Sequence, residues 1–540
     1  MSISASMQIG MNGLNIFRSA TAVISQNIAN VSTPGYSRQK AIIESAPTTN
    51  LSGFTLGSGA MITSIERFHD ALLHRQTANS ETTLGYNSTK SMALQQIEPA
   101  FNDIGVDGVG AALAHFFAAW QDLTNNPGGI AERQGVLSNA QLLADEIHSS
   151  SKTLTDLISL QNISLTPTID DINIKLKEIA RLNGQVTATE MVTGNANEVK
   201  DKRDLLLLQL SKQIGITITE NGDGTTDVKL VNSGEALVTG ANVGVFSLDK
   251  TTDPNSYKVQ LIQVGGTQAT ISNPVLYTGS LGATLDLRDT IIPGYLTKLD
   301  DLATTLATDI NTQHKLGFDL NAVAGIDFFN PSKTKAGDLT NGSNVVSNVD
   351  VTGLWVGMQV DNANITGGTA LIGSINLTGS FTLVDSNNVA VNATATAPAS
   401  TITFPNGTAS ALFSINPAMS TYTVAASSQN SNAGDNINAV KIAGLATQRR
   451  MSGTPPTLTF SGYWDAFVSK MGLDVNSSKT NVAQDEAFNN QLKILKDSTS
   501  GVSLDQELSD MMMYQRSYQA CAQVISTATA MMDILLGIVR

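Results

Sequence analysis

The chain has 540 residues, of which 41% are hydrophobic, 5% aromatic and 14% charged, and its formal net charge is -14. This length predicts about three or four domains, and the hydrophobic content is sufficient for packed cores. No basic stripe is present to neutralise phosphates, so we expect no nucleic-acid partner. Cys521 is the only cysteine, which excludes an internal disulfide framework and a cysteine metal cluster.

The N-terminal segment follows an apolar heptad pattern. Alternating steps of four and three from Ile3 reach nine positions up to Val31, and seven of them are apolar, as in the seam of a coiled coil. From Met1 to Ser37 the only charged side chain is Arg18. No basic and apolar leader with a cleavage site is recognisable, so we expect no cleaved signal peptide. The predicted N-terminal seam consists of Ile3, Met7, Leu14, Phe17, Ile24, Ile28 and Val31.

The pair Pro34-Gly35 predicts a turn after this first helix, because proline followed by glycine stops a helix. Extended pieces are then expected at 39–45 and 60–65. Helical periodicity follows, with a break or a kink expected at Pro167. The helical segments are expected at 66–101, 108–123, 130–187 and 198–214.

Alternating strand patterns begin near residue 215 and continue to about residue 285, with strands expected at 216–220, 227–231 and 236–239. A helix is expected at 296–312. The segment 341–404 has few charges and many Val, Ile, Thr, Asn and Gly residues, which is typical of an inserted β module. Its strand candidates are 343–349, 381–385 and 399–404, and helices are expected after it at 463–471 and, in two or more pieces, from Gln484 to the C-terminus.

The C-terminal segment repeats the apolar heptad over five heptads, with nine of eleven positions apolar. The apolar run Met531–Val539 contains Asp533 and is far shorter than the ~20 residues that cross a bilayer, so we expect no membrane insertion. The other faces of both terminal helices are poor in charge, although a solvated helix normally carries charges there. The predicted C-terminal seam consists of Leu504, Leu508, Met511, Tyr518, Ala522, Ile525, Met532, Leu536 and Val539.

These patterns predict an elongated, multidomain α+β protein whose two ends pair. We expect the terminal helices to be poorly ordered in a lone monomer and to fold when subunits stack. The alternative is a closed hairpin buried within one domain, because heptads do not reveal their partners. The expected domains are terminal coiled-coil helices (1–48 with 502–540), a helical rod domain (49–214 with 405–501), a β-rich outer domain with a helix at 296–312 (215–340), and the inserted β module (341–404).

Patterns for catalysis or metal binding are weak. His69 and His74 are five residues apart, about 140° around a helix, which is a poor spacing for a ligand pair. No His-Glu-x-x-His, P-loop or Gly-x-Ser-x-Gly pattern occurs. The segment 221–227 lacks the later glutamate of a calcium loop, so a hairpin turn is expected there. We expect no enzyme activity, no cofactor and no catalytic or metal site.

The segment Asn27-Ile-Ala-Asn-Val-Ser-Thr-Pro-Gly-Tyr-Ser-Arg-Gln39 resembles the N-terminal signature of bacterial flagellar axial proteins, and 501–507 with 514–525 resembles their C-terminal signature. Among these proteins, the Arg38-Gln39 pair and the segments 282–303 and 311–319 are most similar to the hook-associated protein 1 (FlgK) family. The resemblance covers about 1–330 and 405–540, but not the insert. The signature residues are Asn27, Asn30, Thr33, Pro34, Gly35, Tyr36, Arg38 and Gln39.

The resemblance implies an extracellular structural subunit at the junction between the hook and the filament. It implies export in unfolded form through the flagellar type III apparatus, without a cleaved signal, and a dedicated chaperone at the C-terminal helix. The implied partners are other copies of the chain, the hook protein and a second junction protein. Tyr36, Arg38 and Gln39 could contact a neighbouring subunit or form a solvated loop. The alternatives are a hook or distal rod protein, or a secreted adhesin or surface enzyme.

Overall fold

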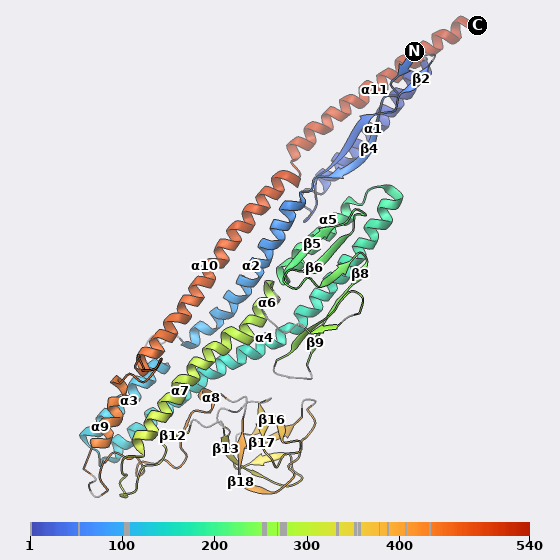
Figure 1. Ribbon diagram of the computed structural model, residues 1–540. Helices are drawn as coiled ribbons and strands as arrows, with labels where there is room; N and C mark the ends of the chain where they lie inside the picture. The colour runs from blue at the N-terminus through green and yellow to red at the C-terminus, as the bar shows by residue number, and fades with distance from the viewer. Residues whose placement is uncertain are drawn as a thin grey trace.

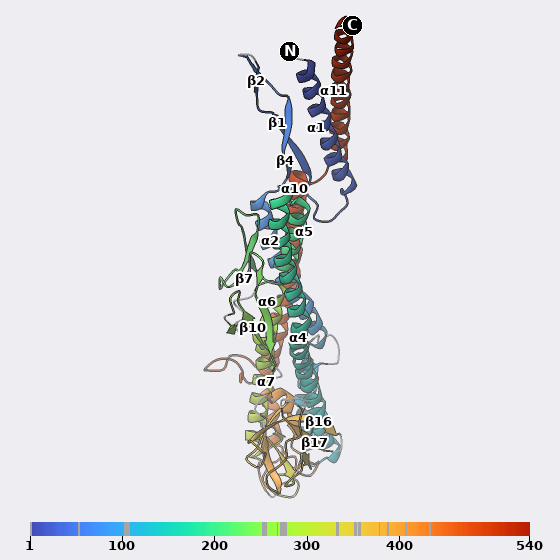
Figure 2. The ribbon, with the colours of Figure 1, turned by 90° about the vertical axis from the view of Figure 1, so that its right-hand side faces the viewer.

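The computed structural model describes residues 3–51, 54–101, 108–250, 256–266, 268–270, 278–330, 334–349, 351, 354, 358–376, 379–385, 388–404, 408–430, 432 and 434–539. The molecule is elongated, with both termini at one end and a small barrel near the other (Figure 1). A view turned by 90° shows the same order along the long axis (Figure 2). The mixed α+β class expected from the sequence is confirmed.

The terminal end contains two long helices, α1 (Ile3–Ala29) and α11 (Leu504–Val539), which lie side by side. A bulged antiparallel hairpin of β1 (Gln39–Ser45) and β4 (Ala60–Arg67) also packs against α1. The short strands β2 (Thr49–Leu51) and β3 (Phe54–Leu56) extend its tip. Helix α1 therefore has neighbours on two sides.

A rod of packed helices, called the rod domain below, contains α2 (Ala71–Ile97), α3 (Val109–Asn125), α4 (Ile130–Thr193), α7 (Ile292–His314), α9 (Ile437–Gly444) and α10 (Phe460–Ser500), with the short helices η1 (Glu98–Phe101) and η4 (Leu445–Thr447). Helix α6 (Gly279–Asp286) leads into α7 through the π-helical turn η3 (Leu287–Ile291). An aromatic core with Phe116, Trp120, Phe328 and Trp464 holds the far end of the rod together.

Three helix boundaries differ from those expected. Helix α2 begins at Ala71, because Asp70 caps it by accepting bonds from the N–H groups of Leu72 and Leu73. Helix α4 is continuous through Pro167, so the chain does not break there. Residues 472–483, which were expected to separate two helices, lie inside α10, where packing along α2 overrides a run of weak helix formers.

Two small antiparallel sheets lie beside α4. Strands β5 (Ile216–Glu220), β6 (Thr226–Leu230), β7 (Ala236–Thr239) and β8 (Asn242–Val243) form one, and β9 (Val245–Asp249), β10 (Lys258–Ile262) and β11 (Gln268–Thr270) form the other. Their apolar side chains share a core with α4, α5 (Asn197–Gln213) and α6. The expected helix at 296–312 is part of α7, and Leu299, Leu302 and Leu306 are buried in the core of the rod.

The insert is a closed antiparallel barrel with its own apolar core, strand order β13-β14-β17-β16-β15-β18. Its strands are β13 (Thr334–Leu339), β14 (Val345–Ser347), β15 (Gln359–Asp361), β16 (Thr369–Asn376), β17 (Ser380–Val384) and β18 (Ala397–Thr403). The first strand precedes residue 341, the expected start of the module. The paired strands β12 (Phe329–Asn330) and β19 (Ser414–Ile415) and the short helix α8 (Ala409–Leu412) link the barrel to the rod. The domain division stays a prediction.

Candidate assembly surface and its joint

Helices α1 and α11 pair in antiparallel directions, as three contacts along them show. Gly10 faces Ile525, Gly13 faces Cys521, and the rings of Phe17 and Tyr514 lie 6.0 Å apart. A Cβ added at Gly13 would lie 2.5 Å from the Cys521 Sγ, and one at Gly10 would lie 2.7 Å from Ile525 Cγ1. The glycines therefore allow the two helices to approach closely.

The covered face of α11 has a heptad period of its own. Glu507, Tyr514, Cys521 and Ala528 recur every seven residues, and Glu507 and Ala528 are the buried residues among the described side chains of this helix. Because seven residues are close to two helical turns, these side chains line one stripe that faces α1.

The part of the α11 circumference outside the covered stripe, called the open face below, exposes apolar side chains distributed around the helix. The large apolar side chains on it are between 41% and 63% exposed: Leu504, Leu508, Met512, Met513, Tyr518, Val524, Met531, Ile534, Leu535 and Leu536. Of the predicted C-terminal seam, Met511, Ile525 and Met532 are partly buried, whereas Leu504, Leu508, Tyr518, Ala522 and Leu536 are exposed. The Val539 side chain lies outside the described residues. The predicted seam is thus divided between a covered face and an open one.

The predicted N-terminal seam is less divided. Ile24 is buried, Ile3, Met7, Leu14, Phe17 and Ile28 are partly buried, and Val31 lies exposed beyond the helix end. Sequence reasoning did not include Ile16, Ala20 and Val23, which are also buried. These small and β-branched residues lie one position beside the predicted seam and widen the apolar face of the helix. A wide apolar face fits a helix with neighbours on two sides.

The signature residue Asn27 is the centre of a joint between the terminal helices and the rod domain. Its side chain is 1% exposed. Its amide donates to the Gln39 carbonyl at 2.9 Å and to Glu507 Oε2 at 3.0 Å, while its Oδ1 accepts from the Tyr36 hydroxyl and the Gln39 N–H. The Asn27 side chain therefore bonds to three segments of the chain: the loop at Tyr36, strand β1 at Gln39 and helix α11 at Glu507.

Arg38 connects the same joint to α11. Its Nε lies 2.5 Å from Glu507 Oε1 and its Nη2 lies 3.3 Å from Asp510 Oδ2, and its guanidinium sits 5.2 Å from the centre of the Phe68 ring. The Arg38 N–H also donates to the Ser500 carbonyl at the end of α10. A fully buried carboxylate is costly unless it is paired, and Arg38 with Asn27 provides that pairing for Glu507.

A second ion-pair group fixes the joint to α5. The Ser37 N–H donates to Asp201 Oδ2, and Arg67 Nη1 lies 2.9 Å from Asp201 and 2.7 Å from Asp204. Burial, followed by the charges of Asp201 and others, raises the pKa of Tyr36 to about 12. The Tyr36 hydroxyl therefore stays protonated and able to donate to Asn27 at ordinary pH.

The other signature residues shape the loop. The Asn30 side chain donates to the Gln26 carbonyl and accepts from Thr33. Gly35 has φ +83°, a conformation that favours glycine, and a Cβ there would also lie 3.1 Å from Leu205. Pro34 is exposed, and Gln39 Oε1 accepts from Asn197. The sequence predicted a turn here, but it did not predict the bonds between this segment and Glu507, almost 500 positions later in the chain.

Comparisons with known proteins agree with this architecture. The model of the FlgK helical domain matches residues 94–329, that of the flagellar basal body rod protein matches 7–36, and that of the rod FlgEFG C-terminal region matches 497–538. Flagellar hook-associated protein 1 of Escherichia coli is 27% identical over 99% of this chain and all of its own length, and that of Bacillus subtilis is 24% identical over 98% and 97%. The flagellar hook junction protein FlgK of Burkholderia pseudomallei has a similar fold, with a TM-score of 0.60, 17% identity, and coverage of 79% of this chain and all of its own.

The chain belongs to the flagellar hook-associated protein 1 (FlgK) family. FlgK proteins are structural components of the flagellum and not enzymes. The chain is accordingly a hook-filament junction protein of the extracellular axial structure. The family expected from the two terminal signatures is confirmed.

The histidines of this FlgK chain lie closer together than their spacing implied. His69 precedes α2, so the rings of His69 and His74 lie 5.5 Å apart. Burial lowers the pKa of His74 to about 4. Among the described residues, no group of three or more His, Cys, Asp or Glu side chains could hold a metal ion. Within the segment 221–227, residues 221–225 form the turn between β5 and β6, and β6 begins at Thr226.

One helical stretch of the described chain, Phe460–Gly537, contains an 18-residue window of mean hydropathy 1.4, long and apolar enough by composition to cross a membrane, of which 6% is buried. The apolar run Met531–Val539 is shorter than this window. The α11 part of this stretch contains the exposed apolar residues of the open face, and Asp510, Arg516 and Asp533 interrupt them. The stretch fits a helix whose partners are other proteins.

Proposed function

We propose that this FlgK chain joins hook to filament by polymerising through the open face of α11, while α1 occupies the covered face. The observation that carries the proposal is the set of exposed apolar side chains from Leu504 to Leu536, on a helix that already has one partner. Large exposed apolar patches mark interaction sites in soluble proteins. A second seam on the same helix needs a second helix, and other subunits of the axial structure supply it.

Exposed apolar side chains also occur on the neighbouring part of α10. Phe488 is 54% exposed and Ile494 is 71% exposed, and these residues precede the joint with α11. The open surface therefore spans both sides of the joint. Because Arg38 and Asn27 tie α1, α10 and α11 together there, we propose that the signature residues set the angle between the terminal pair and the rod domain rather than contacting a neighbour.

We further propose that the chain is exported unfolded through the type III apparatus and that a chaperone holds the C-terminal helix before export. An unmasked apolar stripe is an association hazard in the cytoplasm, which supports a protective partner. The proposed partners outside are copies of the same chain, the hook protein and a second junction protein. Joining two unlike structures requires separate contacts, and the long molecule offers separate surfaces along its axis.

The proposal is tested by placing a charge on the open face. We expect Leu508→Asp with Leu536→Asp to abolish joining of hook and filament in cells, because buried carboxylates would separate the stacked helices. The matched control is Leu473→Asp on α10, an exposed leucine outside α11. Free hooks without filaments are expected for the double variant and normal flagella for the control. Normal flagella from the double variant would overturn the proposed assembly face.

Deletion of residues 504–540 tests the rest of the proposal. We expect this variant to keep the fold of the rod and barrel but to lose both joining and binding to the chaperone. Circular dichroism of the purified variant checks the remaining fold, and co-purification from the cytoplasm checks chaperone binding. A truncated chain that still binds the chaperone would contradict its proposed site.

A further inference from the structure

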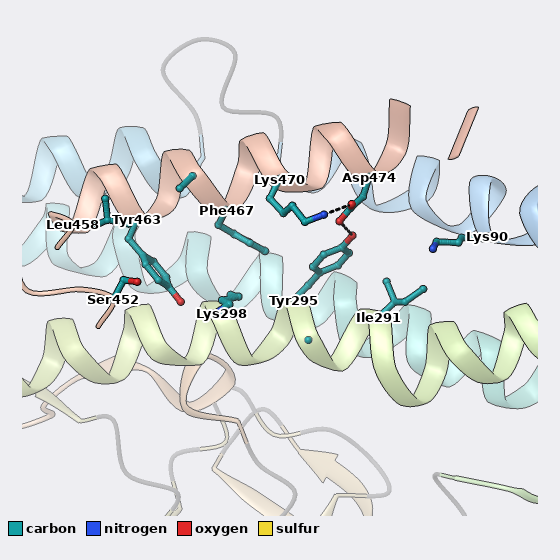
Figure 3. Close-up of a pocket in the computed structure, with 12 residues that line it drawn as sticks. Lys90, Ile291, Tyr295, Lys298, Ser452, Leu458, Tyr463, Phe467, Lys470 and Asp474 are labelled. Carbon is teal, nitrogen blue, oxygen red and sulfur yellow. Dashed lines mark hydrogen bonds and ion pairs between the residues drawn. The ribbon is translucent and has the colours of Figure 1, made fainter. Parts of the chain in front are cut away.

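A groove opens on the rod domain between α7 and α10, far from the terminal pair. Its volume is about 490 Å³. Tyr295, Tyr463 and Phe467 form an aromatic floor, and Leu458 and Ile291 close its ends (Figure 3). Each of these aromatic side chains is largely buried and belongs to the core of the rod, so the groove has a preformed apolar base.

Three lysines surround this groove in a chain whose net charge is -14. Lys470 is paired with Asp474, which also accepts from the Tyr295 hydroxyl at 2.9 Å. Lys90 and Lys298 form no ion pair with any carboxylate of the described residues, and Lys298 Nζ lies 5.9 Å from the Tyr463 ring. The rim therefore has two cations available to an acidic partner.

The long helix α4 has an outer stripe of complementary character. Leu160, Ile163 and Ile174 are 50%, 63% and 65% exposed. Ile163 lies nine residues after the fully buried Leu154, which places it half a turn round, on the side away from the rod core. Asp156 pairs with Lys152 and Asp171 pairs with Lys175. Asp170 is therefore the carboxylate of residues 152–175 that has no ion pair among the described residues.

Groove and stripe lie close to the same height on the rod. Asn162 of α4 bonds Arg288, three residues before Ile291 of the groove. Ser151 of α4 is linked through Ser410 to Asp300, just past Lys298. The α7 part of the groove therefore lies level with the α4 segment just before Leu160. In Figure 3 the pale ribbon coloured for α4 runs behind the groove, so the two surfaces face different directions.

We propose that the groove of one copy receives the outer stripe of α4, residues 160–174, from a second copy of this chain. Apolar side chains of the stripe would cover the aromatic floor, and Asp170 would approach the unpaired lysines of the rim. Two different surfaces at similar height that face different directions give a heterologous contact, which repeats round a ring or helix. The inference rests on the proposed assembly function and assigns it a lateral interface on the rod domain.

The single cysteine of the chain makes this contact directly testable. In a Cys521→Ser background, Lys298→Cys and Leu160→Cys are combined and flagella are isolated from cells that produce this variant. Treatment with a short bismaleimide is expected to give a ladder of dimers and higher oligomers on denaturing gels. Neither single-cysteine variant should give dimers, whereas a mixture of both should give dimers without a ladder.

The control replaces Leu160→Cys with Met191→Cys, an 82% exposed residue at the end of α4, about 46 Å along the helix at 1.5 Å per residue. We expect at least about a tenfold lower yield of crosslinked product from this pair. The inference is overturned if flagella that contain the junction protein give no crosslink with the Leu160 pair, if one cysteine suffices, or if the control crosslinks equally. Those outcomes leave joining through α11 intact, so the two proposals fail separately.

A variant without new thiols gives a second readout. Ile163→Asp is expected to reduce the number of filaments per cell while the melting temperature of the monomer stays unchanged, because the side chain is exposed. Met191→Asp should change neither quantity. Equal filament numbers for the two variants would also overturn the lateral interface.

Discussion

The rod domain and the terminal pair are both built from long helices, but they bury their side chains very differently. In the rod, Trp120 and Trp464 are at most 1% exposed, among side chains from several helices. In the described part of α11, only Glu507 and Ala528 are buried. Most helical stability in proteins comes from tertiary packing. From this difference we expect that the rod contains its own source of stability, whereas the terminal pair obtains much of its stability from neighbouring subunits.

A cavity in the rod should give the largest effect on the stability of the monomer. Trp464→Ala should lower the free energy of unfolding of the monomer by about 3–5 kcal/mol, because a fully buried indole leaves a large void. Leu536→Ala, on the open face of α11, should change it by less than about 0.5 kcal/mol. Urea denaturation of the purified monomer measures both. Equal effects of the two substitutions would contradict the division into a self-stabilised rod and a dependent pair.

The pH dependence of the rod depends partly on His314. Its Nδ1 bonds the Ile326 carbonyl and its Nε2 accepts from the Ala425 N–H, and burial lowers its pKa to about 4. The unfolded chain binds a proton near pH 6.5 and the folded chain does not, so this group destabilises the fold as pH falls from about 6.5 to 4. The expected loss is up to about 3 kcal/mol.

His314→Gln should therefore flatten the stability curve between pH 6.5 and 4, whatever its effect at neutral pH. Thermal unfolding in a pH series measures the slope. His115→Gln, which replaces an exposed histidine of α3, is the control and should keep the slope of the natural chain. An unchanged slope in the His314 variant would show that this ring binds its proton at the same pH in the folded and the unfolded chain.

A substitution in the joint is expected to have an intermediate effect on stability. Asn27→Ala leaves the Gln39 N–H and carbonyl without their partner and removes one bond to Glu507, which should cost about 2 kcal/mol. Because the loss is local, we expect it in the hydrogen exchange of 36–39 and the first turns of α11. Asn30→Ala, whose bonds stay within its own turn, should cost less than about 1 kcal/mol. Similar exchange in both variants would argue against a central role for Asn27.

The smallest effect concerns the close approach of α1 and α11. Gly13→Ala should loosen the pair by about 1 kcal/mol, because the new methyl group meets the Cys521 sulfur. Cys521→Ala in the same chain should restore most of it. A double-mutant cycle on the exchange of α1 isolates the coupling between these residues. Simple additivity of the two changes would mean that the helices do not meet at this register.

Periodicity predicted much of the fold and the pairing of the two ends, but not the other long-range contacts. The helices at both ends, the strands from residue 216 and the helix at 296–312 are all present, because their apolar spacing reflects local burial. The continuity of α10 through 472–483 could not be read, since contact with α2 overrides the local sequence there. The closure of the barrel was also hidden, because it depends on pairing β13 with β18, more than 50 residues later.

The candidate site was predicted in part for the same reason. A single heptad frame identified both terminal helices but could not separate the covered face of α11 from the open one, since the two overlap at Met511, Ile525 and Met532. The pairing of Arg38 with Glu507 spans 469 positions and has no local signal. Its trace in the sequence was the scarcity of charge at both ends, which made each remaining charged residue a candidate for a specific bond.

Hydrogen exchange of the full chain, as a dilute monomer and within isolated flagella, tests the central claim most directly. We expect the amides of α11 to exchange quickly in the monomer while those of α4 and α7 are protected, and we expect α11 to become as protected as the rod after assembly. Full protection of α11 in the dilute monomer would contradict the claim that the terminal pair depends on neighbouring subunits.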